Sequence, residues 1–267
     1  MKLKKELGQN FLINNYDIQA FINFCDLKKQ DIVLELGPGN GALTKLISPK
    51  VSRIIAIELD LKMTLFLNNL KIKNLIIENC DFLDLNLREV ITTNSVTKII
   101  GAIPYYISSP IIHKVIKEAT TPLEETCLIT QKEFALKLIG KKPLHTNKKN
   151  QLPSRSYFTN LVEKYAQITQ GAFIDKTSFN PIPKVDSMYF KLKHTNYPLN
   201  SNEVEHWSKF LHHVFKTPRK KINKRFSKKM LHSMDINENI RPENLSGKQL
   251  ENLYNKTSTY RLKRLIL

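Results

Sequence analysis

The sequence predicts an α/β protein, with a mostly parallel sheet in the first part of the chain and a small all-helical domain at its end. From residue 31 onward, short runs of Ile, Leu and Val alternate with segments long enough for helices. The runs show no polar alternation, which is typical of parallel strands buried on both faces. Strand-like runs stop near residue 198. Because 267 residues exceed the usual size of one domain, we expect one domain over 1–195 and a helical domain over 196–267.

Five apolar runs are predicted to form the parallel strands: Asp31–Leu36, Arg53–Glu58, Asn74–Glu78, Thr97–Ile103 and Thr126–Thr130. In open sheets of this kind, ligands bind outside the carboxyl ends of the strands. The loops that follow the first four strands, 36–41, 58–60, 81–83 and 102–106, should therefore line one crevice.

The second half of the chain begins with a polar stretch, Gly140–Ser154, which contains two prolines and is predicted to be a mobile surface loop. After a proline-punctuated segment over 180–184, Ser187–Lys193 is predicted as a late strand of the sheet. Three later segments have helical periodicity: Val204–Phe215, Arg219–Met230 and Gly247–Asn255.

The net charge of +18 predicts an anionic partner. Residues 1–130 hold 15 Lys and Arg against 14 Asp and Glu, whereas residues 131–267 hold 27 against 10. This asymmetry indicates a nearly neutral half and a half that neutralises phosphates, with binding that weakens as salt rises. The alternative is a solvated, Lys-rich surface without a specific partner.

Composition also excludes several classes of protein. No run approaches the roughly 18 apolar residues that a membrane span requires, and the first residues have no apolar core of a secretory signal, so we expect a cytoplasmic protein with no membrane partner. The three cysteines, Cys25, Cys80 and Cys127, are far apart and lack the spacing of a disulfide framework or a zinc site. We expect them to be buried thiols and expect no bound metal.

A glycine-rich turn, Gly37–Gly41, follows the first strand and opens a helical segment, which predicts a nucleotide-like ligand close to the backbone. Glu58, at the end of the second strand, is expected to accept hydrogen bonds from ribose hydroxyls. Asp81 is a candidate acceptor for an adenine amino group, with helix capping as the alternative. The turn alone also fits a dinucleotide cofactor or a plain tight turn without a ligand.

The end of the fourth strand distinguishes methyl from hydride chemistry, because its residues resemble those of a known family. Taken together, five segments are similar to the KsgA (RsmA) family of rRNA adenine dimethyltransferases: Leu7–Leu12, Glu35–Gly41, Asp81–Leu83, Gly101–Pro110 and Phe179–Ser187. The resemblance runs from residue 4 to about residue 253. The Erm methyltransferases share the N-terminal half, whereas Arg219–Lys221 and Ile240–Ser246 favour the KsgA branch.

The resemblance implies a Rossmann-like S-adenosylmethionine-dependent methyltransferase sheet with a small all-helical C-terminal domain. It implies N6-dimethylation of two adjacent adenines in a small-subunit (16S) rRNA hairpin during ribosome biogenesis, on a pre-30S particle, by a monomer. Carried over by position, the cofactor-binding residues would be Asn10, Leu12, Gly37, Gly39, Glu58, Leu59, Asp81, Phe82 and Ala102. The residues around the target adenine would be Ala102, Ile103, Pro104, Tyr105 and Phe179, with Tyr105 stacked on the base and Phe179 near its other face.

One position departs from the family pattern. The family has Asn where this chain has Ala102, and the amide oxygen of that Asn is the usual acceptor for the target amino group. Loss of one positioned acceptor typically costs about 10²–10³ in rate. Three explanations stay open: an engineered inactive variant, a natural lineage that keeps only rRNA binding or ribosome assembly, or compensation by the carbonyl of Ile103 or Pro104.

A basic run in the second half is the predicted RNA-binding surface, because it holds no acidic residue. Its candidates are Lys216, Arg219, Lys220, Lys221, Lys224, Arg225 and Lys228. On the predicted helix, Arg219, Lys220, Lys224 and Lys228 would fall near one face; a solvated helix face is the ordinary alternative. Four histidines are expected at the surface or facing RNA: His206, His212, His213 and His232.

The sequence therefore predicts an rRNA adenine N6-dimethyltransferase. The alternatives are a catalytically weak or inactive rRNA-binding factor of the same fold, an Erm-like methyltransferase of large-subunit rRNA, and, more distantly, a nicotinamide-dependent oxidoreductase.

Overall fold

The computed structural model describes residues 10–140, 155–198 and 201–265. It divides into two compact units, residues 1–135 with 166–198 and residues 136–165 with 199–267, within those described ranges. Residues 141–154 of the predicted loop Gly140–Ser154 and the motif residues Leu7–Gln9 lie outside the described residues. None of the described helices is both long enough and apolar enough to cross a membrane.

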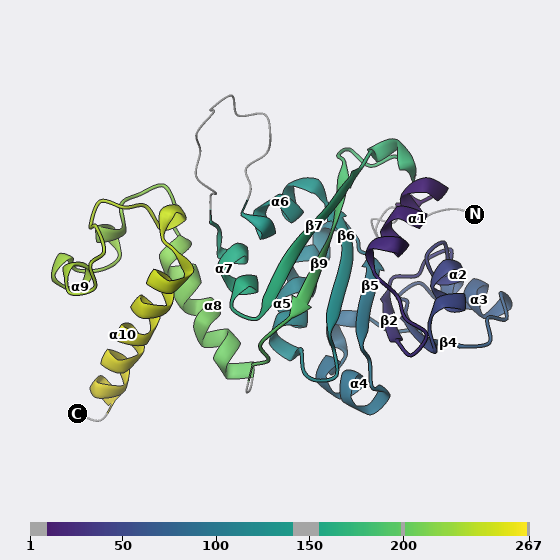
Figure 1. Ribbon diagram of the computed structural model, residues 1–267, viewed down its shortest axis with the longest axis horizontal. Helices are drawn as coiled ribbons and strands as arrows, with labels where there is room; N and C mark the ends of the chain where they lie inside the picture. The colour runs from purple at the N-terminus through teal and green to yellow at the C-terminus, as the bar shows by residue number, and fades with distance from the viewer. Residues whose placement is uncertain (1–9, 141–154, 199–200, 266–267) are drawn as a thin grey trace. The chain divides into compact units, whose positions relative to one another are not determined.

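A seven-stranded sheet forms the centre of the first unit, in the order β4-β3-β2-β5-β6-β9-β7 (Figure 1). Five neighbouring strands are parallel, and each overlaps a predicted strand: β2 (Ile32–Leu36), β3 (Arg53–Ile57), β4 (Leu75–Glu78), β5 (Lys98–Ala102) and β6 (Glu125–Gln131). The predicted late strand is β9 (Ser187–His194), which pairs antiparallel to β6.

One strand of the sheet was absent from the sequence prediction. The strand β7 (Ala166–Ile174) pairs antiparallel to β9 and completes one edge of the sheet. Its polar and apolar residues alternate only loosely, and the pairing is irregular between Gln170 and Phe173, so its two-residue period is weak. At the opposite edge, β4 is only half-buried, which corrects the expectation that every run is buried on both faces.

Helices cover both faces of the central strands. The helices α1 (Asn15–Phe24) and α2 (Thr44–Ile47) pack against Val33, Ile54 and Ile100. The neighbouring residues along the same strands, such as Leu34, Ile55 and Ile99, are equally buried and point to the other face, because side chains alternate along a strand.

The remaining elements of this unit are α3 (Leu61–Asn69), α4 (Leu87–Asn94), α5 (Ser108–Glu118), the first part of α6 (Lys132–Ile139), and the 3-10 helices η2 (Ser48–Lys50), η3 (Phe82–Asp84), η4 (Tyr105–Ile107) and η5 (Lys176–Ser178).

A small second sheet joins the start of the described chain to a late segment. The strand β1 (Phe11–Leu12) pairs antiparallel to β8 (Phe179–Asn180), so that Leu12 lies opposite Phe179. The backbone N–H of Ile13 donates to the carbonyl of Ser178 at 2.8 Å and extends this pairing. Two segments more than 160 residues apart in the chain are thereby held together.

The second unit is helical. It contains α7 (Tyr157–Glu163), α8 (Ser201–Phe215), α9 (Lys228–His232) and α10 (Gly247–Leu265), with the 3-10 helices η6 (Ile222–Lys224) and η7 (Pro242–Asn244). The predicted helices over Val204–Phe215 and Gly247–Asn255 correspond to α8 and to the first part of α10.

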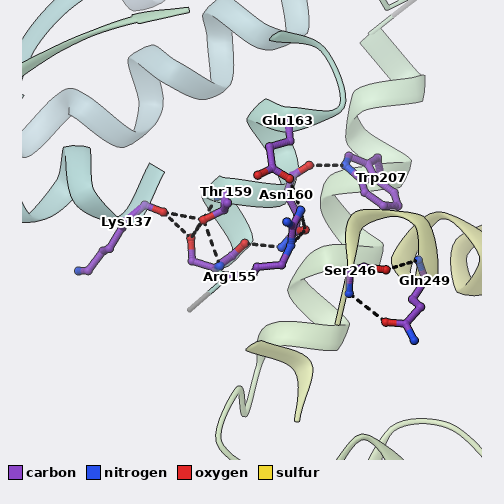
Figure 2. A network of polar contacts seen from close by, with 9 residues as sticks. Lys137, Arg155, Thr159, Asn160, Glu163, Trp207, Ser246 and Gln249 are labelled. Atoms are coloured by element: carbon purple, nitrogen blue, oxygen red, sulfur yellow. Dashed lines mark hydrogen bonds and ion pairs between the residues drawn. The ribbon is translucent and has the colours of Figure 1, made fainter. Parts of the chain in front are cut away.

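The units differ from the expected division at residue 195 mainly because 136–165 groups with the C-terminal helices; the first unit also runs on to residue 198. Polar contacts explain this grouping (Figure 2). The Arg155 guanidinium donates to the side-chain oxygen of Asn160 at 2.8 and 2.9 Å and pairs with Glu163, and the backbone N–H of Arg155 donates to the carbonyl of Glu243. The Asn160 carbonyl in turn accepts a hydrogen bond from Trp207 of α8 at 3.3 Å.

Candidate active site

A cavity in the first unit lies at the carboxyl ends of the parallel strands, as the topology predicts. It brings together every residue that the sequence nominated for the cofactor or the target adenine. Those lining residues are Asn10, Leu12, Gly37, Gly39, Glu58, Leu59, Asp81, Phe82, Ala102, Ile103, Pro104, Tyr105 and Phe179. Asn40 and Tyr106 also line it and lie in loops predicted to do so, although the sequence analysis gave them no role. Phe11 and Cys80 line it as well and were missed, although Phe11 lies in a quoted motif and Cys80 precedes Asp81.

The glycine turn forms one wall of the cavity. Gly37 and Gly39 have φ angles of +62° and +54°, which L side chains rarely adopt. A Cβ built on Gly39 would lie 2.6 Å from Cε1 of Phe11, so a larger residue would require that ring to shift. A Cβ built on Gly37, by contrast, meets no heavy atom within 4 Å. The backbone at Gly37 is therefore open to a ligand.

Glu58 lies at the end of β3, 6% exposed, beside the glycine turn. Its two carboxylate oxygens accept hydrogen bonds from the backbone N–H groups of Gly39 at 2.9 Å and Asp60 at 2.8 Å. Burial raises the pKa of the Glu58 carboxyl, and these two hydrogen bonds oppose the rise. The contacts fix the carboxylate at the cavity wall, where its remaining lone pairs can accept further hydrogen bonds.

Asp81 follows β4 at the next strand end. Its Oδ1 accepts a hydrogen bond from the backbone N–H of Leu83 at 2.8 Å and caps η3. The prediction that Asp81 caps a helix is therefore confirmed. Asp81 also lines the cavity, together with the buried Phe82. The preceding Cys80 is only half-buried, which corrects the expectation of three buried thiols, whereas Cys25 and Cys127 are buried. Cys80 follows an edge strand, which explains its exposure.

The loop after β5 forms the opposite wall. The backbone N–H of Ile103 donates to the carbonyl of Ile129 at 3.2 Å, which extends the β5–β6 ladder by one residue. The carbonyl of Pro104 accepts from the Ile107 N–H at 3.2 Å and from the Ser108 hydroxyl at 3.4 Å. Because these bonds occupy that oxygen, the Ile103 carbonyl is the better candidate acceptor beside Ala102.

Tyr105 begins η4 and is half-buried at this wall. Its hydroxyl lies 2.6 Å from the hydroxyl of Ser187 at the start of β9, and burial raises the pKa of the tyrosine. The contact fixes the ring. Phe179, 3% exposed, reaches the same cavity because β8 is paired with β1. Two aromatic rings from distant segments therefore line one cavity with the glycine turn.

Comparison with known proteins decides which chemistry this arrangement serves. The model of the family described as ribosomal RNA adenine dimethylase matches residues 1–260. The ribosomal RNA small subunit methyltransferase A of Fusobacterium nucleatum is 33% identical over 259 residues, which cover 92% of this chain and 94% of the relative. The protein of the same name from Mycoplasma mycoides is 31% identical and covers 97% of this chain and 99% of the relative. This chain belongs to the ribosomal RNA adenine dimethylase family.

Solved structures show the same fold. A dimethyladenosine transferase from Plasmodium falciparum superposes with a TM-score of 0.73 at 24% identity, covering 93% of this chain and 98% of that one. The 23S rRNA methyltransferase ErmE superposes with a TM-score of 0.66 at 22% identity, covering 92% of this chain and 98% of that one. The adenine dimethylase family is S-adenosylmethionine-dependent.

The residues present fit that cofactor. The open backbone at Gly37 leaves room for a ligand on the glycine turn. The fixed carboxylates of Glu58 and Asp81 supply acceptors at two neighbouring strand ends. A nucleoside with ribose hydroxyls and an adenine amino group needs acceptors of this kind.

The basic run lies in the second unit and is not one helix, which corrects the prediction over Arg219–Met230. The chain forms a turn, η6 and α9 instead. Ile222, the first residue of η6, and Phe226 are both buried, although no α-helix spans them. The Ile222 N–H donates to the carbonyl of Ile240 at 2.8 Å, so a long-range contact replaces the helical hydrogen bond.

The basic side chains of this run therefore do not share one helical face. Lys216, Arg219, Lys220, Lys221 and Lys224 are exposed. Lys228 forms an ion pair with Glu238 at 2.8 Å, and Arg225 donates to the hydroxyl of Thr217 at 2.9 Å. The four histidines, His206, His212, His213 and His232, are exposed as expected.

Proposed function

We propose that this chain transfers methyl groups from S-adenosylmethionine to N6 of two adjacent adenines in a small-subunit rRNA hairpin. The observation that carries the proposal is the single cavity that joins the glycine turn, the Glu58 and Asp81 carboxylates, and the rings of Tyr105 and Phe179. The names of the two bacterial relatives, which are similar over nearly their full length, support small-subunit rRNA as the substrate. We place the reaction on a pre-30S particle in the cytoplasm, carried out by a monomer.

The proposed roles follow from the chemistry of each side chain. Glu58 accepts hydrogen bonds from the ribose hydroxyls of the cofactor, and Asp81 accepts one from its adenine amino group. Gly37 and Gly39 allow close approach to the backbone, while Asn10, Leu12, Leu59 and Phe82 complete the cofactor wall. When bound, S-adenosylmethionine supplies an electrophilic methyl group.

The target adenine is held by the opposite wall. The Tyr105 ring, fixed by Ser187, stacks on the base with a contribution of about 1–3 kcal/mol, and Phe179 approaches its other face. The adenine N6 lone pair is delocalised into the ring, so catalysis requires acceptors that favour a pyramidal nitrogen. The Ile103 carbonyl fills this role only in part, because the side chain of Ala102 offers no acceptor beside it, and the methylated amine releases its proton without a strong general base.

The proposal is tested by incubating the purified chain with labelled S-adenosylmethionine and small subunits that lack the modification. We expect label on two adjacent adenines, located by mass spectrometry of the rRNA, and none on large subunits. Calorimetry should detect S-adenosylhomocysteine binding and no NAD binding. Absence of label on adenine, even with Ala102→Asn, contradicts the proposal.

A second function is favoured by one residue, Ala102, which lines the cavity without a polar side chain. In this alternative the chain binds the small subunit as an assembly factor and transfers methyl groups slowly or not at all. It predicts subunit binding without transfer by the chain as it stands, and turnover once Ala102→Asn restores the amide.

A further inference from the structure

An aromatic residue at the cavity is left unused by the mechanism above. Tyr106 is 61% exposed, yet it lines the same cavity as Tyr105. We infer that Tyr106 is a second stacking platform, which holds the base next to the target adenine while the target lies against Tyr105. This inference rests on the proposed function and adds a site for the neighbouring nucleotide.

The backbone directs the two rings differently. Tyr105 and Tyr106 are the first two residues of η4, and successive side chains of a 3-10 helix leave its axis about 120° apart. The Tyr105 hydroxyl is held by Ser187 at 2.6 Å, whereas the Tyr106 ring extends into solvent. The two hydrogen bonds to the Pro104 carbonyl hold the turn that carries both rings. Tyr106 is therefore a preorganised surface beside the ring assigned to the target base.

The substrate creates a need for such a surface. Removing an adenine from an RNA helix also removes a stacking partner from the base beside it, and this loss opposes extrusion. An exposed aromatic ring replaces the lost stack, and it does so for any base because every base has a π-face. When two adjacent adenines are modified in turn, each is once the target and once the neighbour, so a base lies beside the target in both steps.

Another exposed apolar side chain at the cavity fits the role less well. Leu59 is 50% exposed and lines the cavity, but it follows Glu58 on the wall assigned to the cofactor and has no aromatic face. Tyr106, by contrast, belongs to the loop that carries Ala102 to Tyr105. Its position on the target side indicates RNA as the ligand.

The test compares Tyr106→Ala with Tyr106→Phe, and with Tyr16→Ala as a matched control. Tyr16 is 82% exposed on α1 and is not among the described residues that line the cavity. The RNA probe is a hairpin in which one of the two adjacent adenines is replaced by fluorescent 2-aminopurine. We expect Tyr106→Ala to weaken hairpin binding on the order of tenfold, as the loss of one base–aromatic stack requires, and to increase the probe fluorescence. Tyr106→Phe and Tyr16→Ala should bind the hairpin as the unaltered chain does.

A second measurement separates this inference from the proposed function. S-adenosylhomocysteine affinity, measured by calorimetry, should be equal in all four proteins; a parallel loss in Tyr106→Ala would place the ring on the cofactor side and overturn the inference. Equal hairpin binding and equal probe fluorescence in Tyr106→Ala and the unaltered chain would also overturn it. Because both readouts measure binding, they test Tyr106 even if no methyl transfer is detected, and absent transfer counts against the proposed function alone.

Discussion

The carboxylate of Glu58 accepts a hydrogen bond from the backbone N–H of Gly39 at 2.9 Å, and so joins the end of one strand to the turn after its neighbour. The other oxygen of Glu58 accepts from Asp60 at 2.8 Å. The residue proposed to bind ribose hydroxyls therefore also holds the turn on which the cofactor would lie.

Glu58→Gln should weaken cofactor binding more than its small change in shape suggests. The amide NH₂ cannot accept a hydrogen bond, so the N–H of either Gly39 or Asp60 loses its partner and the glycine turn is held less firmly. The NH₂ also cannot accept from a ribose hydroxyl, and a lost acceptor of this kind costs about 1–3 kcal/mol. We expect S-adenosylhomocysteine affinity to fall about tenfold or more by calorimetry. Glu124→Gln, at an exposed glutamate just before β6, is the matched control and should bind normally. Unchanged affinity in Glu58→Gln would remove Glu58 from the cofactor site.

Ala102→Asn should increase methyl transfer. The side chain at this position lines the cavity at the end of β5, where an added amide oxygen can accept from the target amino group. The gain expected for one positioned acceptor is about 10²–10³ in kcat. Ala102→Leu adds a side chain of similar size without the amide and should give no gain. Equal initial rates for Ala102→Asn and the unaltered chain would show that another acceptor, such as the Ile103 carbonyl, already performs this role.

Glu35 should make the protein less stable as the pH rises. This glutamate of β2 is fully buried, and burial raises the pKa of its carboxyl to about 8, with the nearby Glu58 adding to the rise. The folded state therefore keeps a proton that the unfolded chain has released, and between about pH 4.5 and 8 the free energy of unfolding falls with pH by up to about 1.4 kcal/mol per unit. Below that window this penalty is absent.

Glu35→Gln removes the titrating group but keeps its shape. Urea unfolding at pH 5.5, 6.5 and 7.5 should therefore show a weaker pH dependence in Glu35→Gln than in the unaltered chain, with the largest stabilisation at pH 7.5. Glu58, whose pKa is also raised, keeps part of the dependence in both proteins. Parallel stability curves for the two proteins would mean that Glu35 is not protonated in the folded state.

The side chains of the basic run should contribute unequally to RNA binding, because some of their charges are already paired with acidic residues. Lys220 is exposed, whereas the charge of Lys228 is already paired with Glu238 at 2.8 Å. Lys220→Ala should weaken hairpin binding and reduce the slope of log K against log salt by about 1, and Lys228→Ala should change both less. Glu238→Gln, which releases Lys228, should strengthen binding. Fluorescence anisotropy across a salt series measures all three, and equal effects of the two lysine variants would contradict this order.

The sequence alone determined the parts of this protein that depend on local patterns. Buried parallel strands appear in the sequence as apolar runs, and their carboxyl ends meet at one edge of a sheet. Loops distant in the chain could therefore be assigned to one cavity from the sequence. Gly37 and Gly39 were predictable because a tight turn needs positive φ. Glu58 and Asp81 were predictable because Glu58 directly follows β3 and Asp81 lies three residues after the end of β4.

Only the tertiary structure decided the features that depend on long-range contacts. Phe179 reaches the cavity because β8 pairs with β1, and a pairing across that many residues leaves no periodic signal in either short segment. The basic run does not form its predicted helix because the Ile222 N–H donates to the carbonyl of Ile240. Lys228 forms an ion pair with Glu238, which lies outside the basic run. Local propensity is a weak preference, and a hydrogen bond or ion pair from a distant segment overrides it once the chain has folded.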